Sequence, residues 1–174
     1  NTAGTQGNQI YAVAKDNNGN TFFCGSHTDA LTLGALSLSA GQGGAFFGKA
    51  NAQGNILWLK QGGTQSANSD KAYSITTDQA GSVYVAGAIA GFQTASFDGN
   101  SLSSTYPGFV VKYNNSGNFI WASGVSSNVY CVAIDNNNIP VINAGDQALY
   151  KLDPATGVVD MTTSGLISGN LQNS

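Results

Sequence analysis

Short runs of apolar residues, separated by turn residues, recur along the whole chain. Three of these runs share one pattern, in which a Tyr opens an alternating segment that ends at an Asp: 11–16, 73–78 and 130–135. Alternation over this length is typical of a β-strand with one buried face. Because no stretch keeps a helical period, the sequence predicts an all-β protein.

The pattern belongs to a longer repeat. After each of the first two copies comes a turn with a glycine and a second apolar run, and segments 46–58 and 109–121 then match at an offset of 63. Trp58 and Trp121 hold the same place, and Met161 holds it in a compressed third copy. A period near 60 with several short strands in each unit indicates a repeat architecture.

Each unit reads as four strands. They are predicted at 11–16, 21–24, 45–50 and 56–60, then at 73–78, 83–86, 108–113 and 119–123, and finally at 130–135, 139–143, 148–152 and 158–162. A recurring four-stranded antiparallel sheet with a large aromatic residue on its last strand is typical of a β-propeller blade. We therefore predict one domain of three blades, at about 11–60, 73–123 and 130–162.

The second unit carries a resemblance to a known family. Segments 78–87, 97–103, 108–112 and 116–121 are similar to the bacterial β-propeller repeat called the SBBP repeat. The first unit matches the repeat less closely. The third unit departs from it most, because the loop between its second and third strands is shortened to about 144–147. The resemblance implies a propeller fold in an exported protein and implies no particular activity.

Three blades form an incomplete ring, because propellers close with about 4 to 8 blades. The residues predicted to pack between blades are the large side chains that recur in each unit: Tyr11, Trp58, Tyr73, Trp121, Tyr130 and Met161. The two end sheets would need further partners for this packing. We expect self-association into a six-bladed ring, completion by the rest of a longer parent chain, or an extended assembly.

The composition of the chain indicates which partners it is expected to bind and where the protein is expected to be located. Only 9% of the residues are charged, the net charge is −3, and the chain has no Arg, so we do not expect nucleic acid binding. No apolar run approaches the roughly 20 residues of a membrane span. Because the numbering begins at Asn1, we expect an exported protein at the cell surface or outside the cell, with an upstream segment removed.

The candidate chemistry is sparse. His27 has no clustered ligands, and no Glu is present to close a calcium loop at 16–20, so we expect neither a metal nor another cofactor. Cys24 and Cys131 each replace a small strand residue of the other units, which predicts packed free thiols rather than a disulfide. The Asp and Lys residues that recur in every unit predict structural contacts: Asp16, Asp78, Asp135, Lys49, Lys112 and Lys151.

Two long connections, 27–44 and 88–107, differ between units, and variable loops on a rigid scaffold often bind ligands. The candidate ligand-binding residues in them are His27, Asp29, Phe92, Asp98 and Tyr106. The leading functional hypothesis is a non-enzymatic extracellular module with a structural or adhesive role. The alternative is lectin-like glycan binding through these loops. An enzyme ranks last, and convergence of Asp29, Asp70 or Asp98 in a channel would favour it.

Overall fold

The computed structural model describes residues 7–39, 44–64, 70–91, 93–103, 105–145 and 149–160. Within these ranges the elements are all β-strands, and all the strand pairs are antiparallel. The prediction of an all-β protein is therefore confirmed. The strands are β1 (Gln9–Lys15), β2 (Thr21–His27), β3 (Leu31–Leu33), β4 (Leu36–Leu38), β5 (Gly44–Ala50), β6 (Ile56–Gly63), β7 (Lys71–Thr77), β8 (Val83–Ala88), β9 (Ala95–Phe97), β10 (Asn100–Leu102), β11 (Gly108–Tyr113), β12 (Phe119–Val125), β13 (Val129–Ile134), β14 (Pro140–Ala144), β15 (Leu149–Leu152) and β16 (Val159–Asp160).

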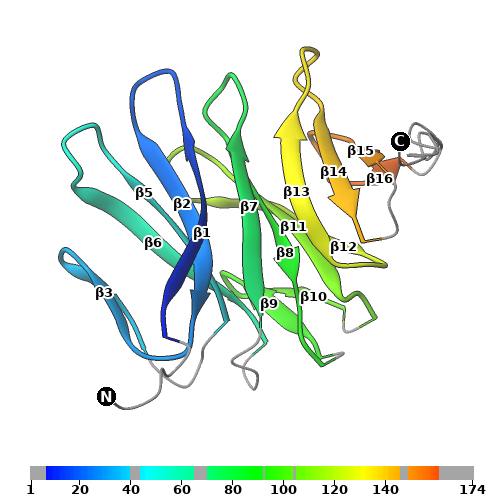
Figure 1. The fold of residues 1–174 in the computed structure, drawn as a ribbon. Coiled ribbons are helices and arrows are strands. Elements are labelled where there is room, and N and C mark those ends of the chain that lie inside the picture. The colour runs from blue at the N-terminus through cyan, green and yellow to red at the C-terminus, as the bar shows by residue number, and fades with distance from the viewer. Residues whose placement is uncertain are drawn as a thin grey trace, which may run out of the picture.

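Three sheets stand in a row like the leaves of a fan, with strands β1, β7 and β13 side by side at the front of Figure 1. The first sheet runs in the order β1-β2-β5-β6-β9-β10, the second in the order β7-β8-β11-β12, and the third in the order β13-β14-β15-β16. Strands β3 and β4 form a separate hairpin that packs near β6. In each unit, four strands thus form a meander whose first strand lies at the front.

The two long connections differ from the prediction, because each contains a short hairpin: β3–β4 in one and β9–β10 in the other. Strand β9 pairs with β6 of the preceding unit, so the first sheet has six strands rather than four. The close approach depends on Gly62, since a Cβ atom there would collide with the ring of Phe97. Strands of three residues are too short for a periodic pattern to reveal.

Apolar side chains fill both spaces between neighbouring sheets. Phe22, Phe47 and Trp58 of the first sheet pack with residues of the second sheet that include Phe109 and, from the β9–β10 hairpin, with Phe97. A second core joins the second and third sheets, and its largest members are Tyr84, Trp121, Ile142, Tyr150 and Leu152. Full burial of one such side chain is worth about 1.5–3 kcal/mol, so each interface contributes strongly to stability.

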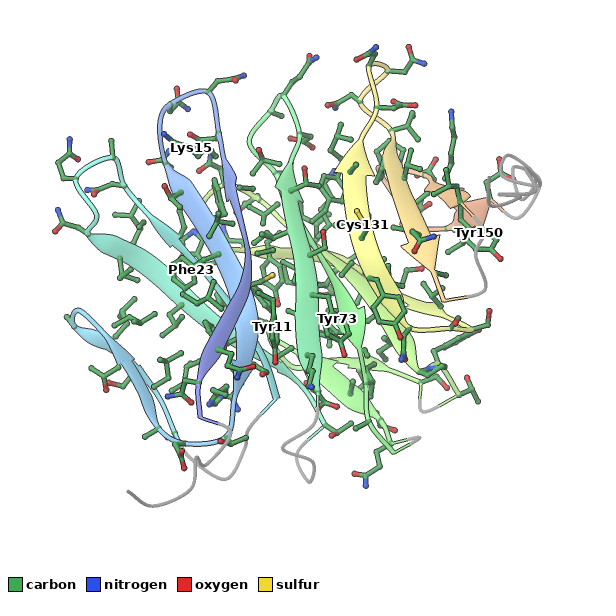
Figure 2. All side chains as sticks on the ribbon, viewed as in Figure 1. Tyr11, Lys15, Phe23, Tyr73, Cys131 and Tyr150 are labelled. Atoms are coloured by element: carbon green, nitrogen blue, oxygen red, sulfur yellow. The ribbon has the colours of Figure 1, made fainter. Side chains whose placement is uncertain are left out.

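Each front strand carries a β-bulge at its recurring tyrosine. The register shifts between Ile10 and Ala12 in β1, and the matching shifts in β7 and β13 fall at Tyr73 and Tyr130. A bulge turns the extra residue away from the regular alternation. The three tyrosine rings consequently form a row, with centroids 5.8 Å apart for Tyr11 and Tyr73, which Figure 2 labels, and 5.3 Å apart for Tyr73 and Tyr130.

Both cysteines are free, but only one of them is packed as expected. Cys24 is buried, and its thiol donates to the carbonyl oxygen of Ala72, 3.3 Å away. Cys131 is exposed, so the prediction of packing was wrong for this residue. At the same position in the second sheet, Ser74 bonds to the backbone of Val132 in the third sheet. No described sheet follows the third one, and Cys131 therefore lies open.

Candidate functional site

A cleft of about 420 Å³ lies where β1 and β7 begin, beside the row of tyrosines. We call it the inner cleft, and its main lining residues are Gln9, Tyr11, Ser26, Lys71, Tyr73 and Asn128. The bulges place the tyrosine rings at this cleft, and the strand ends supply the polar groups around them. The cleft therefore combines aromatic ring faces with hydrogen-bonding side chains.

Hydrogen bonds hold part of this lining in place. The hydroxyl of Tyr11 lies 2.9 Å from Oε1 of Gln9 and 3.0 Å from Oγ of Ser26. The amide of Asn128 donates to the hydroxyl of Tyr130 at 3.3 Å. Among the ion pairs between described residues, none involves Lys71, which leaves a cationic group at the cleft.

The lining of the inner cleft contains both the tyrosine that recurs in each unit and a position that varies between units. Gln9, Lys71 and Asn128 each stand two residues before the recurring tyrosine of their unit, and they differ in chemistry. Sequence reasoning missed this site because it sought variation in the long connections. Comparing the residue two positions before each tyrosine would have been the signal.

A second candidate site is the side of the first sheet that faces away from the second sheet, which we call the leading face. Ile10 and Val13 are 56% and 66% exposed on it. At the matching positions of the second sheet, Ala72 and Ile75 are 0% and 5% exposed, because they pack in the core that the second sheet shares with the first. The β3–β4 hairpin covers part of the leading face, at Phe23 and Phe46, whereas burial of Ile10 and Val13 requires a neighbour that the described chain does not supply.

Tryptophan and lysine together link each sheet to the next. Nε1 of Trp58 donates to the backbone oxygen of Asn115 at 3.2 Å, and Nζ of Lys49 reaches the same oxygen at 3.3 Å. The oxygen of Pro154 accepts from Trp121 at 3.2 Å and from Lys112 at 2.8 Å in the same way. Trp58 and Trp121 therefore lie at the sheet-to-sheet contacts, while Met161 lies outside the described residues.

The recurring Asp residues hold the turns after the front strands. The carboxylate of Asp135 accepts the backbone N–H groups of Ile139 and Asn137 and lies 3.3 Å from Nζ of Lys151. These hydrogen bonds, with the positive charge of Lys151, lower the pKa of Asp135. Asp16 bonds in the same way to its own turn.

Asp70 is the contrasting carboxylate, because it is completely buried. It accepts the backbone N–H groups of Thr64 and Ala90 and the Thr64 hydroxyl, and it thereby ties the end of the first sheet to the second. Burial raises its pKa. Asp98 instead pairs with Lys60 at 2.8 Å, and Asp29 is exposed. No described cavity brings these three acids together.

The candidate residues of the long connections are dispersed as well. His27 is the last residue of β2 rather than a loop residue, and it is fully buried, with its ring edge against Phe46 and Nδ1 3.1 Å from the backbone oxygen of Asp29. Tyr106 lines a separate groove of about 410 Å³ near Tyr150. Phe92 lies outside the described residues. These side chains therefore do not form one ligand site in the described structure.

Within the described ranges, no three His, Cys or Asp side chains lie close enough together to hold a metal ion. The same residues include no helix long and apolar enough to cross a membrane.

Comparisons with known proteins identify no family. No family model matches the chain, and no curated protein matches it. Among solved structures, a protein of unknown function from Bacteroides caccae is similar with a TM-score of 0.42 and 12% identity, over 89% of this chain and 60% of that one. The WD40 β-propeller domain of Doa1 is similar with a TM-score of 0.42 and 9% identity, over 82% of this chain and 50% of that one. The chain thus spans 60% and 50% of the lengths of these two structures.

Proposed function

We propose that the chain is a run of three β-propeller blades of the SBBP type, acting as a non-enzymatic structural or adhesive module of an extracellular surface assembly. The observation that carries this proposal is the exposure of Ile10 and Val13, whose counterparts in the next sheet are buried. A face that repeats a buried interface, yet leaves these two apolar residues open, is suited to bind another sheet of the same kind. Blade-to-blade contact is then the activity of the module.

Three features support the blade interpretation. The sheets are meanders with their first strands side by side, apolar cores fill both spaces between them, and a recurring tryptophan bonds each sheet to the turn of the next. The low content of charged residues and the SBBP-like segments of the second unit support an exported protein. Extracellular location and adhesion are parts of the proposal.

Native mass tests the proposal directly. Light scattering over a range of concentrations should reveal association, and Ile10→Lys or Val13→Lys should shift the equilibrium toward monomer because a charge would enter an apolar interface. Leu57→Lys is the matched control, since Leu57 is 50% exposed on β6 and its counterpart Ile120 is also exposed. A chain that stays monomeric at all concentrations, or a loss of association as large for Leu57→Lys, would contradict the proposal.

The inner cleft favours a second candidate function, which is glycan binding. Sugars are recognised by stacking on aromatic faces and by hydrogen bonds to hydroxyls, and the cleft offers Tyr11 and Tyr73 beside amide groups. A glycan screen with the wild type, Tyr73→Ser and the control Tyr106→Ser tests it. Binding that only Tyr73→Ser abolishes would support this candidate, and a silent screen would count against it.

A further inference from the structure

The contacts between sheets follow one scheme that occurs twice. In the first contact, Lys49 interacts electrostatically with Asp16 of its own unit without a close ion pair, and it donates to Asn115 in the last turn of the second sheet. In the second contact, Lys112 lies 3.7 Å from Asp78 of its own unit and donates to Pro154 in the last turn of the third sheet. In both contacts, a lysine therefore interacts with an Asp of its own unit and donates to the second residue of the last turn in the next sheet. We call this arrangement the scheme.

The third occurrence stops halfway. Lys151 pairs with Asp135 of its own unit at 3.3 Å, as the scheme requires, but no described sheet follows to provide a turn. Its side chain is 44% exposed, compared with 11% for Lys112. An ammonium has three N–H donors, so Lys151 can keep Asp135 and still donate to another acceptor.

The complementary half of the scheme lies at the other end of the chain. The last turn of the first sheet, 51–55, has the same backbone hydrogen bond as 114–118, from Gly54 to Asn51 and from Gly117 to Asn114. A Cβ atom on Gly117 would lie 3.0 Å from the Trp58 ring, whereas one on Gly54 would meet no atom within 4 Å. The turn at 51–55 therefore has the acceptor's form, and no described sheet lies against it as a donor.

We propose that two copies of this chain join head to tail, with Nζ of Lys151 in one copy donating to the backbone oxygen of Ala52 in the other. Ala52 is the second residue of its turn, as Asn115 and Pro154 are of theirs. Such an interface uses different surfaces on the two copies, and rotation about it closes into a ring or continues as a filament. Two copies would give six sheets, within the range in which propellers close.

This inference rests on the proposed function but can fail separately from it. The first test compares Lys151→Gln with Lys60→Gln, because Lys60 pairs with Asp98 and lies near Tyr113, between the first two sheets and away from both ends of the row. We expect Lys151→Gln to weaken the association measured by sedimentation about tenfold and Lys60→Gln to leave it unchanged. Equal effects of the two substitutions would overturn the inference.

A charge exchange provides the second test. Lys151→Glu alone and Ala52→Lys alone should each weaken association, and the double variant should recover most of it, since the new ion pair can form only between copies. If Val13→Lys dissociates the assembly while the Lys151 and Ala52 variants do not, the proposed function stands and this contact is wrong. If the wild type never associates, both are wrong.

Discussion

The leading face of the first sheet and the same face of the second sheet are made of matching residues, but among the described residues only the second lies against another sheet, whereas the first is covered in part by the β3–β4 hairpin. Val13 is exposed where Ile75 is buried, and Gly54 is uncovered where Gly117 lies against Trp58. The difference shows that burial in this protein depends on a sheet's place in the row as much as on its local sequence. Each sheet carries residues on both of its faces that are suited to packing against a neighbouring sheet.

The largest expected effect comes from placing a charge at the enclosed position. Ile75→Lys should lower the free energy of unfolding by about 4–5 kcal/mol, because the ammonium would lose its hydration inside an apolar core. Val13→Lys should change it by about 0.5 kcal/mol or less in the monomer. Urea unfolding at low protein concentration measures the free energy of unfolding of both variants. Equal losses of stability for Ile75→Lys and Val13→Lys would contradict the comparison.

The two cysteines extend the comparison to reactivity. Burial raises the pKa of Cys24 to about 12 and blocks access, so an alkylating reagent at pH 8 should modify it at least about a thousandfold more slowly than a thiol in an unfolded chain. Cys131 is exposed and should react quickly. Single-cysteine variants, Cys24→Ser and Cys131→Ser, separate the two rates. Protection of Cys131 at concentrations where the chain associates would show that the end of the row is covered.

Phe109 and Phe46 provide a finer test, because they occupy the same position of neighbouring units. Phe109 packs between two sheets, with its ring 4.9 Å from Phe97, whereas Phe46 packs against the β3–β4 hairpin beside Phe23. We expect Phe109→Ala to cost about 4 kcal/mol and Phe46→Ala about 3 kcal/mol, since the hairpin can settle into the space left behind. A larger loss for Phe46→Ala in urea unfolding would reverse this order.

The smallest expected effect concerns pH and contrasts open with enclosed carboxylates. Asp135 has a lowered pKa, so its stabilisation is present above the unfolded-state pKa of about 3.9 and is lost as the pH falls through the folded-state value. Asp70 has a raised pKa, and its protonation at falling pH should relieve a cost of burial. Thermal unfolding between pH 7 and 2 should therefore show a weaker acid dependence for Asp135→Asn than for the wild type. An unchanged acid dependence would contradict the assignment.

Much of the fold could be predicted from the sequence, because the alternation of apolar and polar residues and the repeated turn residues indicate where the strands lie. The β9–β10 hairpin was not, since its pairing with β6 depends on Gly62 and Phe97, which lie far apart in the chain. The recurrence of Lys49 predicted a contact but not its partner, which belongs to the next unit. The inner cleft was missed because its variable residues lie at the start of the front strands, or, for Asn128, immediately before one, rather than in the long connections.

The pairing of β9 with β6 also bears on the order in which the chain folds during synthesis. Strand β6 ends at Gly63, and its last two residues, Gly62 and Gly63, pair with β9, which begins only at Ala95. While the ribosome makes the intervening residues, this end of β6 stays unpaired and is a site for wrong pairing. We therefore expect the first two units to mature in one step after the β9–β10 hairpin emerges.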